Sequence, residues 1–157
     1  MAITNLYNFI SLFKANESLD SDSLPLNKIE IPIIQRDYAQ GRKVADVNRI
    51  RKRFLTSLYN ALTECKQLKL DFVYGDIHRK DNKYEYLIPL DGQQRLTTLY
   101  LLHVYAAVRQ SIKNAEETGD QRCLPEGAEK LARFSYETRT SASTLCVNLV
   151  NHFNFAR

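Results

Sequence analysis

Five consecutive residues carry the clearest chemistry in the sequence: Asp91, Gly92, Gln93, Gln94 and Arg95. They stand where a strand-like pattern changes to a helical one, and the first N–H groups of a helix attract anions because they have no intrahelical partners. Gly92 would let an anion approach the backbone, and Arg95 could add a forked contact to phosphate oxygens. Gln93 and Gln94 offer amides that could bind oxygens or orient a water. Asp91 fits a helix N-cap by position and a magnesium ligand by chemistry.

These residues predict a phosphate site in which Asp91, Gln93, Gln94 and Arg95 are the candidate catalytic groups. A purely structural explanation is also open, in which Asp91 only caps the helix and Arg95 is a surface cation. However, a basic residue in the first turn has the wrong sign for the helix dipole unless an anion lies there. Packing also leaves the two adjacent amides unexplained.

Two other segments place polar groups next to strand-like patterns. Gln35, Arg36 and Tyr38 follow an isoleucine-rich strand and could hold a base, sugar or phosphate. The alternative is a charged loop whose side chains pair with one another. Asp76 follows Gly75, and this glycine suggests a β-bulge or a close backbone approach. The Asp76 carboxylate is a further candidate for the binding site, although it could simply cap a turn.

Hydrophobic periodicity predicts the elements that must position these residues. Helical spacing predicts helices at 3–14, 47–67, 93–113 and 141–153. Alternation and turn residues predict strands at 29–33, 68–79, 84–91 and 132–138, of which the second and third form a β-hairpin. Pro32 lacks a backbone donor, so the first strand should be an edge or irregular strand, and Asp46 can cap the second helix. The mixture is α+β, a small sheet with a β-hairpin flanked by helices.

The composition is that of an ordinary globular domain. The 157 residues fit one domain with its own core. The net charge of +4 is mild, but six basic residues fall between positions 42 and 53, either as the solvated face of a helix or as a patch for a phosphate backbone. Three scattered cysteines form no disulfide or metal pattern, which fits a reducing cytoplasm. No apolar run is long enough to span a membrane, and no Walker loop, GxGxxG, HExxH or CxxC motif occurs.

Four strings in the order of the chain resemble the GmrSD-type, DGQQR-motif family of the ParB/sulfiredoxin-like superfamily: IPIIQRDYAQGR, VYGDI, LDGQQRLTTLYLL and FSYETRTS. The resemblance covers about residues 29–153. It implies a ParB/sulfiredoxin-like fold and a nucleotide-binding, NTP-hydrolysing module that uses Mg²⁺. The family's motif residues fall on Asp91 through Arg95, on Gln35 and Arg36 with Tyr38 beside them, and on Arg139 downstream. In such proteins a helical region and an HNH-type nuclease domain often follow and cut phage DNA, including modified DNA.

The leading hypothesis is therefore a regulatory module of a restriction or antiphage enzyme, the N-terminal fragment of a longer protein. Arg95 and Arg36 would neutralise phosphate charge, a glutamine would position water or phosphate, and Asp91 would bind magnesium or fix the local geometry. We expect DNA cutting only with a downstream domain, because the chain has no HNH signature. Two alternatives stay open: a DNA-binding or direct nuclease module that uses the same phosphate site, and a domain that uses the nucleotide only as a structural ligand.

Overall fold

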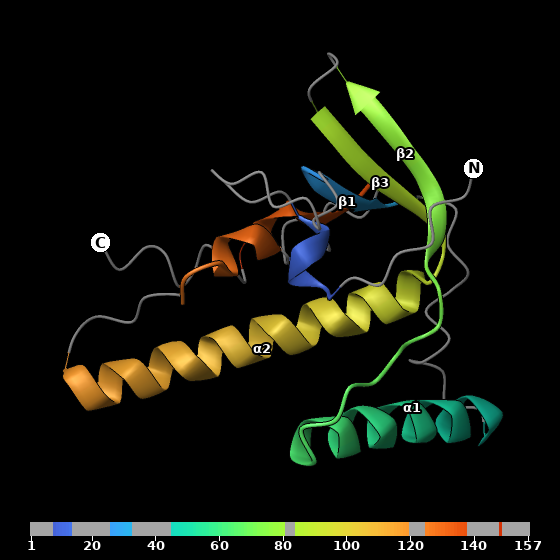
Figure 1. The fold of residues 1–157 in the computed structure, drawn as a ribbon. Coiled ribbons are helices and arrows are strands. Elements are labelled where there is room, and N and C mark those ends of the chain that lie inside the picture. The colour runs from blue at the N-terminus through green and yellow to red at the C-terminus, as the bar shows by residue number, and fades with distance from the viewer. Residues whose placement is uncertain are drawn as a thin grey trace.

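The computed structural model of the chain describes residues 8–13, 26–32, 45–80, 84–119 and 125–137, together with Asn148. Its elements, in chain order, are η1 (Ile10–Leu12), β1 (Lys28–Ile31), α1 (Ala45–Thr63), β2 (Tyr74–Lys80), β3 (Tyr84–Asp91), α2 (Gln93–Thr118), η3 (Ala128–Arg133) and β4 (Phe134–Tyr136). Figure 1 shows the strands above the long helix α2 and the helix α1 below it. The prediction of an α+β fold is confirmed.

The four strands form one mixed sheet in the order β2-β3-β1-β4. β2 and β3 are antiparallel and make the predicted hairpin. β1 runs parallel to β3 on one side, where Ile29 pairs with Leu87, and parallel to β4 on the other, where Ile31 pairs with Tyr136. Because these three strands share one direction, their carboxyl ends lie at the same edge of the sheet.

The sequence predicts an edge or irregular strand here, and the edge alternative is wrong, because β1 lies between β3 and β4. Pro32 follows the last residue of β1, and its missing N–H therefore removes no hydrogen bond from the ladder. Ile29 and Ile31 are both buried, as the alternating pattern predicts. Ile33, the third isoleucine of that pattern, lies outside the described residues.

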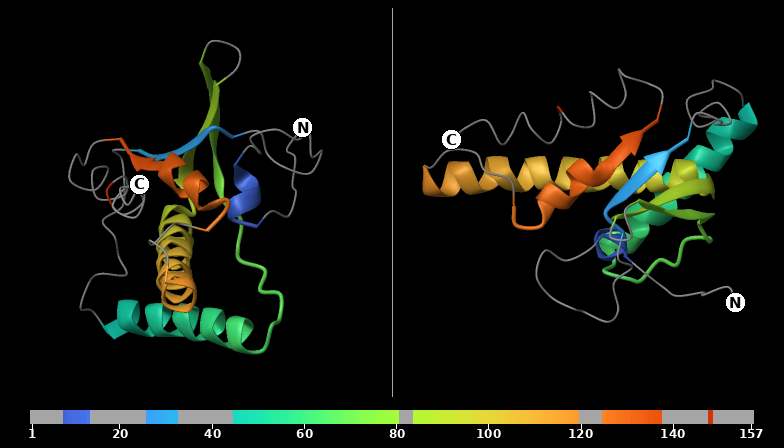
Figure 2. Two further views of the ribbon diagram at one scale, coloured as in Figure 1. Left: turned by 90° about the vertical axis from the view of Figure 1, so that its left-hand side faces the viewer. Right: turned by 90° about the horizontal axis from the view of Figure 1, so that it is seen from above.

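One face of α2 contributes more buried residues to the described core than any other element. Tyr100 of this helix stacks on Phe134 of β4, with ring centroids 4.6 Å apart and planes 12° apart. Phe9 and Phe13 from the N-terminal segment join the same cluster. The buried residues of α2 recur at helical spacing: Leu96, Tyr100, Val104, Ala107 and Ser111. Two further views show α2 running beneath the sheet and α1 on the side of α2 that faces away from it (Figure 2).

Several helix boundaries differ from the predicted ones. α1 begins at Ala45, so Asp46 lies inside its first turn, where a negative charge suits the helix dipole, and does not precede the helix as a cap. α2 continues to Thr118 and ends at Gly119, which has a left-handed backbone. In the region predicted as helix 3–14, the structure describes only the 3-10 turn η1, and Phe13 is already extended. Neither α1, α2 nor any other helix among the described residues could cross a membrane.

The strand boundaries show two clear differences. Ala132 and Arg133, predicted as strand, belong to η3, and β4 spans only Phe134–Tyr136. β2 begins at Tyr74 and not at 68, and the residues between α1 and β2 have no regular structure. The predicted bulge is present, because the pairing register shifts between Tyr74 and Gly75. A Cβ on Gly75 would lie 2.3 Å from the carbonyl oxygen of Ile88, so only glycine allows this close approach. The predicted helix 141–153 lies outside the described residues except for Asn148.

Candidate functional site

The junction between β3 and α2 is a sharp turn at Gly92. Its φ of +81° is left-handed, and it is the N-cap of α2 with no side chain capping it among the described residues. The prediction that Asp91 is the N-cap is therefore wrong, because Asp91 is the last residue of β3. A Cβ on Gly92 would lie 2.9 Å from Cγ2 of Val73. The backbone angle and the contact with Val73 both require glycine, independently of any ligand.

Arg95 in the first turn of α2 is held by the segment that precedes β2. Its Nη2 donates to the carbonyl oxygen of Phe72 at 2.6 Å. Carboxylate oxygens of Asp71 and Asp91 each lie 3.8 Å from the guanidinium. A basic residue at the start of a helix is unfavourable unless anionic groups lie beside it, and the structure places two carboxylates there. Arg95 fastens the 71–73 segment to the start of α2.

The guanidinium of Arg95 keeps unused hydrogen-bonding capacity. Its Nε is buried and has no partner among the described residues, and its side chain is a quarter exposed. An arginine offers five N–H donors in a planar fork. Because the side chain is partly exposed, the guanidinium can hold Phe72 through Nη2 and still offer other N–H groups to a second acceptor.

The two glutamines play different parts. The side-chain amide of Gln93 donates to the carbonyl oxygen of Pro89 at 2.8 Å, so it stabilises the turn between β3 and α2. The Gln94 side chain is half-buried and has no hydrogen bond within the described part of the chain. Asp91 accepts a hydrogen bond from the Gly92 N–H at 2.7 Å and is otherwise largely exposed. Gln94 and Asp91 are thus the residues of this turn that are most available to a ligand.

The sheet brings the motif-bearing segments to one edge. β1, β3 and β4 end there, at Ile31, Asp91 and Tyr136. The Tyr136 hydroxyl lies 2.9 Å from Oγ1 of Thr97, which ties the end of β4 to the second turn of α2. Glu137 donates its N–H to the carbonyl oxygen of Ile31 at 2.9 Å, so β1 and β4 stay joined at this edge.

Four predicted binding residues, Gln35, Arg36, Tyr38 and Arg139, lie outside the described residues. Along the chain, Gln35 is four residues beyond the end of β1, and Arg139 is three residues beyond the end of β4. A chain extends at most about 3.6 Å per residue, so short segments connect them to this edge.

Asp76 lies near the start of the antiparallel strand β2. It is exposed and pairs in register with Ile88, and it comes two residues after Tyr74, whose partner is Asp91. No group of three or more His, Cys, Asp or Glu side chains that could hold a metal occurs among the described residues. Mg²⁺ commonly uses one or two carboxylates together with phosphate oxygens and waters. The exposed carboxylate of Asp91 fits that mode and does not fit an all-protein metal cage.

Sequence reasoning missed Asp71, Phe72 and Val73. They fix Arg95 and Gly92 in place, yet they lie about twenty residues earlier in the chain. Thr97 was missed as the contact of Tyr136. No local pattern marks these residues, because the hairpin and the sheet bring them to α2.

These observations define a class: an α+β domain in which a strand, a glycine turn and a long helix meet the ends of two parallel strands. The family model of the GmrSD restriction endonuclease N-terminal domain matches residues 11–155. The chain therefore belongs to this family of restriction endonuclease domains. A search of curated proteins found no match, and a search of solved structures found none either.

Proposed function

We propose that this domain binds a nucleoside triphosphate with Mg²⁺ at the start of α2, hydrolyses it, and thereby regulates a restriction or antiphage endonuclease. The observation that carries the proposal is the shared edge at which β1, β3 and β4 end. Ligands of sheets with parallel strands bind beyond the carboxyl ends of those strands. Three of the four DGQQR-family strings begin in strands that end at this edge. A ParB/sulfiredoxin-like fold for the domain is part of the same proposal.

The phosphates would bind the free N–H groups of the first turn of α2. The Gln94 side chain, which has no hydrogen bond within the described residues, and the exposed part of the Arg95 guanidinium would add contacts to phosphate oxygens. Arg36 and Arg139 would contribute further positive charge, and Gln35 and Tyr38 would contact the rest of the nucleotide. Hydrolysis needs a positioned water and neutralised charge more than a covalent nucleophile.

Asp91 bears directly on the role of magnesium. Its carboxylate lies beside the N–H of Gly92, close to where the phosphates would bind, and two negative groups at that separation repel each other. A magnesium ion between Asp91 and phosphate oxygens removes this repulsion and supplies the usual ligand set of the ion. Asp76 is a second carboxylate on the neighbouring strand that could bind a water of this ion.

Gln94→Ala is the cleanest test, because the Gln94 side chain has no hydrogen bond in the described structure that its loss would break. Binding of fluorescent ATP and GTP analogues would be measured with Mg²⁺, and phosphate release would be followed in parallel. We expect about tenfold or weaker binding for Gln94→Ala, since a hydrogen bond to a charged group is worth about 1.5–3 kcal/mol. The matched control is Gln110→Ala, an exposed glutamine further along α2, which should bind as the wild type does.

Arg95→Ala should abolish nucleotide binding, but it also removes the contact with Phe72. Circular dichroism of the variant is therefore needed beside the titration. Equal nucleotide affinity in Gln94→Ala, Arg95→Ala and the wild type would refute the placement of the site. Salt-dependent DNA affinity without any nucleotide binding would favour the alternative, a DNA-binding or nuclease module at the same edge. Binding without phosphate release would leave the nucleotide as a structural ligand.

A further inference from the structure

Helices α1 and α2 both expose large apolar side chains. Leu55, Tyr59 and Leu62 of α1 and Leu101 and Tyr105 of α2 are between 46% and 66% exposed, and we call these five residues the α1–α2 surface. None of the α1 side chains is buried, and no described element packs extensively against this helix. Isolated exposed leucines are ordinary, but a cluster on two helices marks an interaction site.

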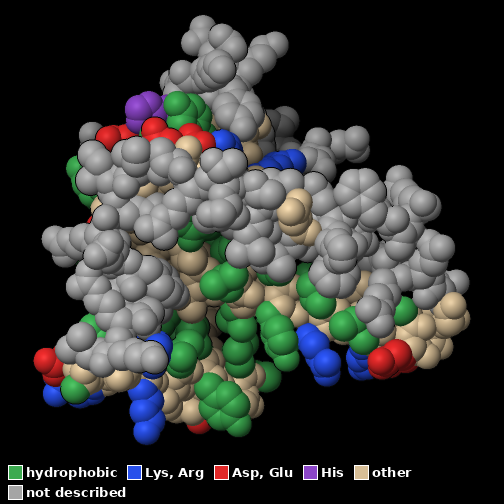
Figure 3. All heavy atoms as spheres, turned by 180° about the vertical axis from the view of Figure 1, so that it is seen from behind, with side chains coloured by type: hydrophobic (Ala, Val, Ile, Leu, Met, Phe, Trp, Pro, Cys, Tyr) green, Lys and Arg blue, Asp and Glu red, His purple; other side chains and the backbone are tan. Residues whose placement is uncertain are grey.

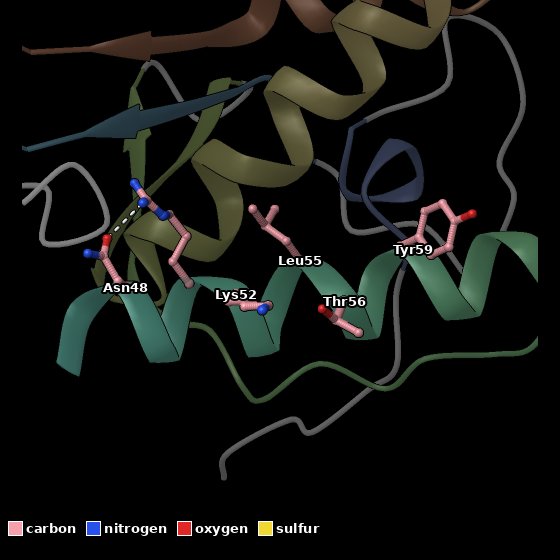
Figure 4. A pocket seen from close by; sticks show the side chains of 6 residues that line it. Asn48, Lys52, Leu55, Thr56 and Tyr59 are labelled. Atoms are coloured by element: carbon pink, nitrogen blue, oxygen red, sulfur yellow. Dashed lines mark hydrogen bonds between the residues drawn. The ribbon is translucent and has the colours of Figure 1, made fainter. Parts of the chain in front are cut away.

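The ribbon views place both helices on one side of the sheet. α1 lies on the side of α2 that faces away from the sheet in both ribbon views. Figure 4 shows Leu55 and Tyr59 rising from the side of α1 that is turned to α2. Seen from behind, hydrophobic side chains gather between the two helices, with lysines and arginines beside them (Figure 3).

A shallow open depression of about 510 Å³ lies along α1. Leu55, Tyr59 and Thr56 line it together with Arg51, Lys52 and Asn48. Four residues of α1 are basic and one is acidic, which gives the helix a net charge of +3. Arg49 pairs with Asp46 at 3.4 Å, whereas Lys52 and Arg53 have no acidic partner within the described residues. The apolar residues are thus flanked by positive charge.

The combination of apolar and positive groups indicates which kind of partner fits the α1–α2 surface best. A second copy of the chain would bring two helices of charge +3 together, and like charges at an interface oppose association. DNA would satisfy the charge, but phosphates gain nothing from burying Leu55 and Leu62. An amphipathic helix with acidic flanks satisfies both features, because its apolar stripe covers the leucines and its carboxylates meet the basic side chains.

We propose that the α1–α2 surface docks an acidic amphipathic helix from another region of the GmrSD-type endonuclease to which this N-terminal domain belongs. The family is described as the N-terminal domain of a restriction endonuclease, so the proposal takes the occupant from a further region of such an enzyme. A segment on the same polypeptide has an effective concentration in the millimolar range, so even a shallow site is occupied. The inference uses no residue of the proposed nucleotide site and stands or falls separately from it.

The test measures binding of the 157-residue chain to a fluorescently labelled peptide by anisotropy. The probe is a designed helix with leucines at helical spacing and glutamates on both flanks. We expect saturable binding that rising salt weakens. The double variant Leu55→Ser/Leu62→Ser should lose affinity by about tenfold or more, because it removes apolar area from the surface. Both side chains are about half-exposed or more, so the variant should keep the circular dichroism spectrum of the wild type.

Two controls sharpen the result. Ile77→Ser changes an equally exposed residue on β2 and should bind the peptide as the wild type does. A peptide with lysine in place of each glutamate should not bind. The proposal is overturned if the acidic peptide fails to bind or binds the double variant equally well. It is also overturned if the double variant instead loses affinity for a short DNA duplex, or loses a dimer seen by sedimentation, since those results assign the surface to nucleic acid or to a second copy.

Discussion

Gly92→Ala should destabilise the protein far more than the same change at Gly119, although both glycines flank α2. Their φ angles are +81° and +75°, so alanine is strained at both positions by about 1–2 kcal/mol. Only Gly92 is crowded. A Cβ there would lie 2.9 Å from Cγ2 and 3.2 Å from Cα of Val73, whereas at Gly119 no described atom comes within 4 Å. The pair therefore separates backbone strain from steric contact.

Forcing a methyl group against Val73 costs about 1–3 kcal/mol more, the usual range for overpacking. We expect a loss of about 2–5 kcal/mol for Gly92→Ala and about 1–2 kcal/mol for Gly119→Ala. The free energy of unfolding would be measured by urea titration with far-UV circular dichroism. Both substitutions restrict the unfolded chain equally, so that effect cancels in the comparison.

Val73→Ala supplies a second arm, because it removes the nearest atom, Cγ2. The double variant Gly92→Ala/Val73→Ala should lose about 0.5–3 kcal/mol less stability than the sum of the two single losses. The reasoning is refuted if the two alanine variants lose equal stability, or if Val73→Ala and Gly92→Ala are additive. Either result would mean that the 71–73 segment does not pack against the turn before α2.

Three further changes test other contacts. Thr97→Val and Tyr136→Phe each remove one end of the 2.9 Å hydrogen bond between α2 and β4. Each should lower the free energy of unfolding by about 0.5–1.5 kcal/mol, and the double variant should lose less than the sum of the two single losses. Additive losses in urea titration would argue against the bond. Phe134→Ala removes the ring that stacks on Tyr100 and should lower the free energy of unfolding by about 3–5 kcal/mol. The control Ile77→Ala changes an exposed residue and should lower it by no more than about 0.5 kcal/mol. Similar melting curves for the two variants would contradict this description of the core. Asp91→Asn keeps an acceptor for the Gly92 N–H but loses the negative charge. Nucleotide binding by this variant should therefore respond less to chelation of Mg²⁺ than binding by the wild type does. An unchanged response in the same titration would exclude Asp91 as a magnesium ligand.

Several local features could be predicted from the sequence because each depends on neighbouring residues. The change from alternating to helical periodicity indicates that a helix opens next to Gly92, and α2 begins at Gln93. Gly75 indicates a close backbone approach, and the structure has a register shift there. The two strands separated by a short polar turn form the predicted hairpin. Periodicity and glycine conformations are short-range properties, so the chain itself encodes them.

Only the tertiary structure decided the strand order and the partners of the site. Pro32 suggested an edge strand, yet β1 lies between β3 and β4, because the strand ends one residue before the proline. The guanidinium of Arg95 meets a carbonyl 23 residues away. Leu55 and Leu62 of α1 stay exposed although their spacing is that of a buried face. Helical periodicity in the sequence indicates which side chains of α1 share one face. Whether that face finds a partner depends on how distant segments pack together, which no local pattern in the sequence records.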